Sequence, residues 1–246
     1  MINAFYSATS GAVSYQNKLN VTANNLANVG TTGFKAQRAT FTDLLYTGIP
    51  SAENRLQMGN GVKIGDISPG ISPGSIVETG RSLDLSIEGE GYFCVRDAAG
   101  NNYYTRAGAF QISTDTTEGY IVTSNGDFLL DETLLPISIT DGADQTSFST
   151  SSIGGTDNRI QPAVFEFDNP YALIFEGQGR LSATGASGEG RISYDSKIRR
   201  GTLEASNVDT ASEMTGLLLS QRGFQFCARI TQAVDEMEKT ANSLRG

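Results

Sequence analysis

The sequence predicts an α+β protein in which long N- and C-terminal helices pack as a coiled coil around the insertion of a central all-β domain. Apolar residues recur at alternating spacings of three and four at both ends of the chain, which indicates helices with an apolar seam. The middle alternates with a period of two and contains hairpin signals. The 246 residues divide into an N-terminal assembly helix (1–34), an extended connecting segment (35–74), the β domain (75–200) and a C-terminal assembly helix (201–246).

The N-terminal segment is almost uncharged, because Lys18 is its one charged side chain up to residue 34. Its seam consists of Phe5, Ala8, Ala12, Tyr15, Leu19, Thr22, Leu26 and Val29. We expect the helix to end at Val29–Gly30, since glycine is favoured just after a helix. Its many Ser, Thr, Gly and Asn residues are poor helix formers, so the helix should be stable only when neighbours surround it. An ordinary core helix of a globular domain is the alternative interpretation.

The middle of the chain begins with a glycine-rich stretch, Ala36 to Gly74, which we interpret as an irregular connecting segment. Strand signals follow, with a hairpin predicted from residues 91–95 to 103–105. The Asn125-Gly126 pair predicts a second hairpin with a type I′ turn. The carboxylates in this region, notably Asp84 and Asp127, are expected to be solvated strand and turn residues.

The C-terminal helix should begin between Ser206 and Thr210, where Thr210-x-x-Glu213 fits a capping box. Its seam consists of Leu219, Gly223, Phe226, Ile230, Ala233, Met237, Thr240 and Leu244. The two seams therefore look suited to lie along one axis, and we expect the function to depend on that pairing.

Composition excludes several functional classes. The chain contains no histidine, which excludes a histidine-based nucleophile relay and argues against a structural zinc site, and a formal net charge of −9 with scattered basic residues does not favour nucleic acid. Cys94 and Cys227 are isolated, which favours small buried thiols over a disulfide. We expect no cofactor, no metal and no catalytic residues; a cell-wall hydrolase that uses Glu88 or Glu90 is the enzymatic alternative. The sequence also lacks a secretory signal and any long apolar run, so we expect no direct membrane insertion and a soluble protein that either stays inside the cell or leaves it by a route that needs no cleavable signal.

Several motifs resemble those of the bacterial flagellar rod and hook proteins. The N-terminal run Leu19 to Lys35 and the C-terminal runs Gly201 to Asp209 and Gln221 to Phe224 are similar to the two ends of that family. Gly89 to Phe93 and Tyr104 to Phe110 match its middle motifs. The motif residues that we carry over are Asn24, Asn25, Leu26, Ala27, Asn28, Gly33, Phe34, Ser206, Asn207, Val208, Gln221 and Arg222.

The resemblance implies a structural, non-enzymatic subunit of the flagellar basal body, located in the cell envelope outside the cytoplasmic membrane. It implies partners of three kinds: copies of the chain in a helical tube, other rod and hook subunits, and the flagellar export apparatus. The segment Phe41 to Tyr46 is similar to subunits of the distal rod. A proximal rod or hook-type paralogue remains an alternative, as does a secreted coiled-coil stalk that carries a β-domain binding head.

Overall fold

The computed structural model describes residues 2–49, 56–113, 119–139, 162–194 and 196–245. The chain forms two compact units. Unit 1 comprises Met1–Ala27, Gln37–Pro69 and Asp209–Gly246, and unit 2 comprises Asn28–Ala36 and Gly70–Val208. Two helices and a β-rich region between them confirm the α+β class; each unit is described separately below.

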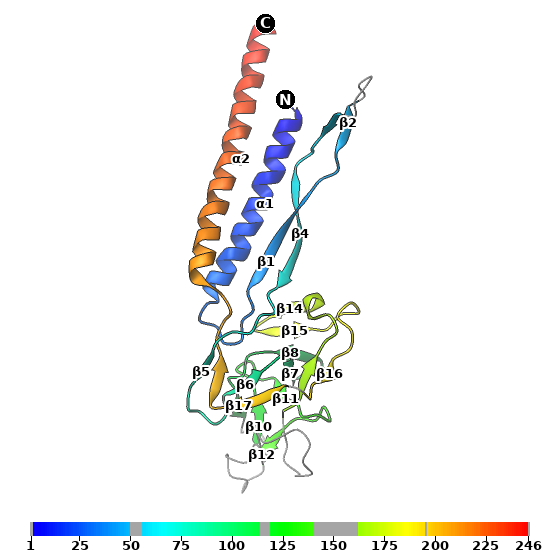
Figure 1. Ribbon diagram of the computed structural model, residues 1–246, viewed down its shortest axis with the longest axis vertical. Helices are drawn as coiled ribbons and strands as arrows, with labels where there is room; N and C mark the ends of the chain where they lie inside the picture. The colour runs from blue at the N-terminus through cyan, green and yellow to red at the C-terminus, as the bar shows by residue number, and fades with distance from the viewer. Residues whose placement is uncertain (1, 50–55, 114–118, 140–161, 195, 246) are drawn as a thin grey trace. The chain divides into compact units, whose positions relative to one another are not determined.

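Unit 1 contains a pair of antiparallel helices, α1 (Ile2–Ala27) and α2 (Thr210–Arg245) (Figure 1). Small residues allow the helices to approach closely. A Cβ at Gly223 would lie 2.6 Å from the Tyr15 ring, and one at Gly11 would lie 3.0 Å from Cys227 Sγ. Side chains larger than glycine would therefore push the two helices apart.

Both helix boundaries differ in detail from the prediction. The first helix ends at Ala27 rather than at Val29–Gly30, because the chain turns into unit 2 and Thr31 N–H donates to Asn28 O at 3.1 Å. The second begins at Thr210, within the predicted range, but the predicted capping box is wrong. Its N-cap is Asp209, whose Oδ1 accepts the Ala211 N–H at 3.1 Å. The Glu213 carboxylate instead accepts a hydrogen bond from Asn25 Nδ2 at 3.1 Å.

The segment predicted as an irregular connection contains four strands of unit 1, which corrects that expectation. They are β1 (Gln37–Asp43), β2 (Thr47–Ile49), β3 (Leu56–Met58) and β4 (Val62–Pro69). The pairs β1–β4 and β2–β3 are antiparallel, with a bulge between Thr40 and Phe41. Most side chains of β1 and β4 are exposed, and the alternation of apolar and polar residues is short, with Ala39 and Phe41 in β1 and Val62 and Ile64 in β4.

Hydrogen bonds attach the antiparallel pair β1–β4, which with the chain between its strands we call the hairpin, to α1. Ser14 Oγ donates to Val62 O at 3.2 Å, and the Val62 N–H donates to Ser10 Oγ at 3.3 Å. The Tyr15 and Phe41 rings lie with centroids 5.5 Å apart. The serines that lower the helix propensity of α1 thus satisfy backbone groups of β4.

Unit 2 is built from short strands. Its largest sheet includes the order β12-β10-β11-β7-β8-β15-β14, and the pairs β17–β6 and β18–β5 join its two sequence ends. The elements are β5 (Ile76–Glu78), β6 (Leu85–Glu88), β7 (Tyr92–Arg96), β8 (Asn102–Thr105), β9 (Gln111–Ser113), β10 (Gly119–Val122), β11 (Phe128–Leu129), β12 (Ser138–Ile139), β13 (Val164–Glu166), a 3₁₀ turn (Pro170–Ala172), β14 (Ile174–Gly177), β15 (Arg180–Ser182), β16 (Arg191–Ile192), β17 (Lys197–Arg200) and β18 (Thr202–Glu204). Antiparallel pairing of β7 with β8 confirms the first predicted hairpin.

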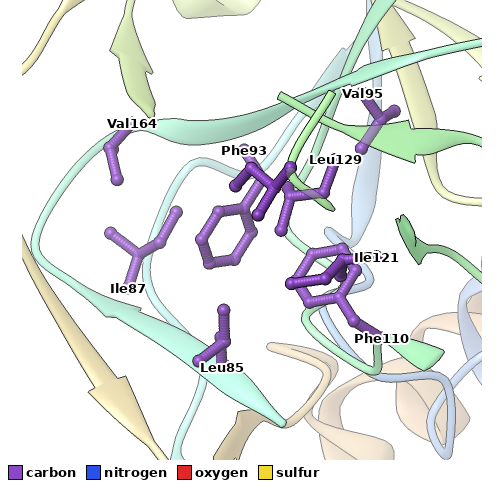
Figure 2. Close-up of a cluster of buried hydrophobic side chains, with 9 residues drawn as sticks. Leu85, Ile87, Phe93, Val95, Phe110, Ile121, Leu129 and Val164 are labelled. Atoms are coloured by element: carbon purple, nitrogen blue, oxygen red, sulfur yellow. The ribbon is translucent and has the colours of Figure 1, made fainter. Parts of the chain in front are cut away.

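The apolar core of unit 2 lies between these strands (Figure 2). Phe93 and Phe110 are fully buried and meet edge to face, with ring centroids 5.4 Å apart. The side chains around them converge from several strands: Leu85, Ile87, Val95, Ile121, Leu129, Ile137 and Val164. Cys94 is also buried and free, and burial raises the pKa of its thiol to about 12, so it stays protonated at neutral pH.

The second predicted hairpin forms, but its turn is not type I′. Strands β10 and β11 pair, and the Gly126 N–H donates to Thr123 O at 3.0 Å. Gly126 has a φ of 89°. Among the described non-glycine residues only Leu134 and Gln178 have a positive φ, so the φ of Asn125 is negative. Asn125 therefore lacks the positive φ that type I′ requires of both central residues.

Two carboxylates expected to be solvated are buried. Asp84 accepts a hydrogen bond from Thr79 Oγ1 at 2.7 Å, and Asp127 lies 2.9 Å from Arg180 Nε. Glu88 and Glu90 are exposed, as expected for solvated residues. Asp84 and Asp127 stabilise the turns around them, because each of the two buried carboxylates interacts with a side chain of a neighbouring loop or strand.

Candidate assembly surface

Residues of the N- and C-terminal sequence motifs meet inside unit 2. The Gly33 N–H donates to Glu204 O at 2.8 Å, and the Asn207 N–H donates to Phe34 O at 3.4 Å. The Asn207 side chain accepts the Ala36 N–H at 2.7 Å and donates to Gly70 O at 2.9 Å. We call Gly33, Lys35, Arg106, Glu204 and Asn207 the motif junction.

A buried ionic cluster forms the centre of the motif junction. Lys35 Nζ lies 2.6 Å from Glu204 Oε1, and Arg106 Nε lies 3.5 Å from Glu204 Oε2. The three side chains are 4, 4 and 2% exposed, respectively. Burial lowers the pKa of Lys35 below its ordinary value, although the neighbouring Glu204 acts in the opposite direction.

Backbone groups complete the coordination of this cluster. Lys35 Nζ also donates to Ser72 O at 3.0 Å, and the Gly74 N–H donates to Glu204 Oε1 at 2.8 Å. Arg106 donates to Gly89 O at 2.6 Å. Glu204 therefore connects four segments that are distant in the sequence, which makes it the central residue of the motif junction.

Replacing Gly33 with alanine should destabilise unit 2 by about 3 kcal/mol, because it adds backbone strain and overpacking. Gly33 has a φ of 68°, and a Cβ there would lie 2.5 Å from Ala107 N and from Arg106 C. Thiol labelling of buried Cys94 in increasing urea, in a Cys227→Ser background, would measure the unfolding of unit 2. Gly30→Ala is the matched control, since nothing lies within 4 Å of its Cβ position; equal urea midpoints for the two variants would contradict the expectation.

Asn25 has a comparable connecting role in unit 1. It is 1% exposed, donates to Gln37 O at 2.8 Å and accepts the Gln37 N–H at 2.8 Å. Its bond to Glu213 adds α2, so one motif side chain joins both helices to β1. The resemblance to the rod and hook proteins included Asn25 as a motif residue but did not predict this bridge.

The other motif residues have varied surroundings. Val208 is buried, and Ser206 Oγ accepts the Val208 N–H at 3.3 Å. Asn28 Oδ1 accepts a hydrogen bond from Thr31 Oγ1 at 3.1 Å. The remaining positions are exposed or half-buried: Asn24, Leu26, Ala27, Phe34, Gln221 and Arg222.

The predicted seam of α1 lies largely at the margin of its packed face. Ala8 and Thr22 are buried, whereas Val29 is 42% exposed and lies beyond the helix, in unit 2. The remaining seam residues are half-buried: Phe5, Ala12, Tyr15, Leu19 and Leu26. The α1 seam therefore contributes to the fold of unit 1 and still presents part of its surface to solvent.

The large apolar residues of the predicted α2 seam are exposed, whereas its Gly223 packs against Tyr15 of α1. Glu213 and Cys227 also contact α1, and Ser220 and Val234 are buried. Four of the predicted positions each lie one residue before a buried or half-buried residue of α2. Their side chains are therefore rotated by about 100° around the helix from its packed face. These positions are Leu219, Phe226, Ile230 and Ala233.

We call Leu219, Phe226, Ile230, Ala233, Met237 and Leu244 the α2 stripe. Its five large side chains are 63, 61, 48, 49 and 84% exposed, in the order Leu219, Phe226, Ile230, Met237 and Leu244. No member is charged. A row of exposed, uncharged apolar side chains of this kind is typical of a surface that another protein covers.

Comparison with known proteins identifies the family. Three family profiles match: the flagella basal body rod protein profile at residues 5–35, the flagellar hook protein FlgE/F/G D1 domain at 86–154 and the flagellar basal body rod FlgEFG C-terminal profile at 199–244. The flagellar basal-body rod protein FlgG of Borreliella burgdorferi is 33% identical over 100% of this chain and 99% of its own length. This chain belongs to the flagellar basal-body rod family.

Other full-length relatives refine this placement. FlgG of Bacillus subtilis is 34% identical over 96% of this chain and 97% of its own length. The flagellar hook-basal body complex protein FlhP of the same organism is 26% identical over 100% of both chains. The rod-family resemblance predicted from the motifs is thus confirmed, and the flagellar basal-body rod proteins FlgG match this chain at 33 and 34% identity.

The family is structural rather than enzymatic. Within the described ranges, no Cys, Asp and Glu side chains form a group of three that could hold a metal ion. Neither α1 nor α2 is sufficiently long and apolar, over its described residues, to cross a membrane.

Proposed function

We propose that copies of this chain polymerise helically into the hollow distal segment of the flagellar rod, a drive shaft that transmits torque from motor to hook. Membership of the rod family supports a structural subunit of the basal body. The observation that carries the proposal is the α2 stripe, which the fold of the chain itself leaves uncovered.

The energetics of the α2 stripe favour assembly with several neighbours. Its five large side chains together expose about as much surface as three fully exposed ones, so their complete burial would contribute roughly 5–9 kcal/mol, at about 1.5–3 kcal/mol for each fully exposed side chain that becomes buried. The loss of translational and rotational freedom on association costs about 4–15 kcal/mol. One contact of this size therefore gives weak binding, and stable assembly requires each copy to meet several others, as subunits of a helical tube do.

In this proposal, the predicted coiled-coil packing of the α2 seam forms between chains rather than within one chain. Within a chain, α1 and α2 pack through small residues such as Gly11 and Gly223. Knob-like apolar residues of the α2 stripe remain for packing between chains. Interfaces with other rod and hook subunits, and passage through the flagellar export apparatus to a site outside the cytoplasmic membrane, belong to the same proposal.

Electron microscopy of basal bodies from a strain that lacks this gene would test the position in the rod. We expect a rod whose proximal segment is present and whose distal segment is missing. Restoring the gene should restore the distal segment. A rod that lacks its proximal segment, or a complete rod that lacks only a hook, would overturn the distal assignment in favour of a paralogue. The similarity to FlhP over the whole of both chains is the observation that supports this second candidate.

A further inference from the structure

We propose that the α2 stripe of one copy docks into a groove between α1 and β4 of a second copy. The inference rests on the proposed assembly into a rod and specifies which surfaces meet. Both surfaces belong to unit 1, so each copy carries one of each.

The groove is a described feature of unit 1. Strands β1 and β4 run alongside α1 (Figure 1), and an open cavity of about 510 Å³ lies between α1 and the hairpin. Its apolar lining includes Tyr6 and Val13 of α1 together with Leu44, Val62 and Ile64 of the hairpin. Tyr6 is 64% exposed and Val13 is 53% exposed, so the chain itself leaves the groove uncovered.

The two surfaces are complementary in chemistry. Lys63 is the one charged residue that lines the groove among the described residues, and no carboxylate lines it. The α2 stripe is uncharged, and the exposed charged residues beside its last turns are one lysine, Lys239, and three carboxylates, Asp235, Glu236 and Glu238. A docked stripe would bury apolar side chains against apolar side chains and would bring these carboxylates into the neighbourhood of a lysine.

The geometry of such a contact explains continued growth. The α2 stripe and the groove are different surfaces, so their pairing is heterologous rather than two-fold symmetric. After one contact forms, the first copy still offers a free groove and the second copy still offers a free stripe. A repeating contact between identical chains follows, which is what a helical polymer requires.

Photo-crosslinking from the α2 stripe tests the pairing. In the full-length chain, p-benzoylphenylalanine replaces Phe226, and rods are irradiated in cells. We expect a band at twice the subunit mass, whose cross-linked peptide comes from residues 6–17 or 44–64 of the second copy. The same group at exposed Gln225, about 100° around the helix, should give at least tenfold less of these peptides.

A groove substitution provides an independent readout. Val13→Arg should reduce incorporation into rods at least tenfold, whereas Gln16→Arg, on an exposed position of the same helix, should incorporate normally. Unchanged far-UV circular dichroism would show that α1 still forms. Cross-links from position 226 to α2 or to unit 2 of the second copy would overturn the docking, and so would rods that form without any cross-link. These results would leave the proposed function intact, which would itself fail only if variants of the α2 stripe were incorporated normally.

Discussion

Replacing Phe226 with aspartate should abolish incorporation of the subunit into the rod while leaving both units folded. Phe226 is 61% exposed within the chain, so the substitution removes little packing from unit 1. In an assembled interface the carboxylate would be buried without a partner, which costs several kcal/mol. A cost of about 3 kcal/mol already corresponds to a loss of more than 100-fold in affinity.

Immunoblots of purified basal bodies and swarming on soft agar would measure the effect of Phe226→Asp. Gln225→Asp is the matched control, because it adds the same charge at the neighbouring exposed position of α2. Incorporation of Phe226→Asp at the level of this control would mean that the α2 stripe is not an assembly surface. Phe226 provides a cleaner test than Leu26, which is half-buried and also contributes to the fold of unit 1.

Replacing Glu204 with alanine should destabilise unit 2 by about 3–5 kcal/mol, the range found when one partner of a buried ion pair is removed. The substitution leaves Lys35 and Arg106 buried, with their charges no longer matched by a carboxylate. It also removes the acceptor of the Gly74 N–H. Most domains of this size have only 5–15 kcal/mol of stability, so a large fraction of unit 2 would unfold under mild conditions.

Urea titrations with Cys94 labelling, again in a Cys227→Ser background, would report this loss specifically for unit 2, because Cys94 is fully buried there. Glu88→Ala serves as the control, since Glu88 is an exposed carboxylate at the end of β6 in the same unit. A urea midpoint for Glu204→Ala that matches the control would show that the ionic cluster contributes little to stability. Glu204→Gln should retain part of the stability, because an amide oxygen can still accept from Gly74.

Local signals in the sequence were sufficient for much of the fold. The hairpin from β7 to β8 followed from two short strand-like runs joined by a glycine-containing turn, and the range predicted for the α2 start includes Thr210, although the capping box that suggested it does not form. The strands β1 and β4 were missed because most of their side chains are exposed and their alternation is too short to stand out in a glycine-rich stretch. The type I′ turn at Asn125-Gly126 was wrong because the loop closes through Thr123 and Asp127 instead.

The motif junction could not be derived from residue patterns at all. Lys35 and Glu204 are 169 residues apart in the sequence, and a single lysine or glutamate gives no sign that it will be buried. Similarity to the rod family marked Gly33 and Asn207 as important, but their role became visible only when distant segments met. Ion pairs between remote segments depend on the whole chain path, which periodicity does not report.

By itself the sequence determined the family, the two helical ends, the β-rich middle and the existence of an apolar stripe on α2. Only the tertiary structure decided which face of α2 contacts α1. The helices approach through Gly11, Ser220 and Gly223, because small residues permit close packing. An apolar period reveals that a helix has a surface to bury but not what buries it. The face selected by close packing lies one residue, or about 100°, away from the apolar stripe, and that offset leaves the large side chains of the α2 stripe exposed.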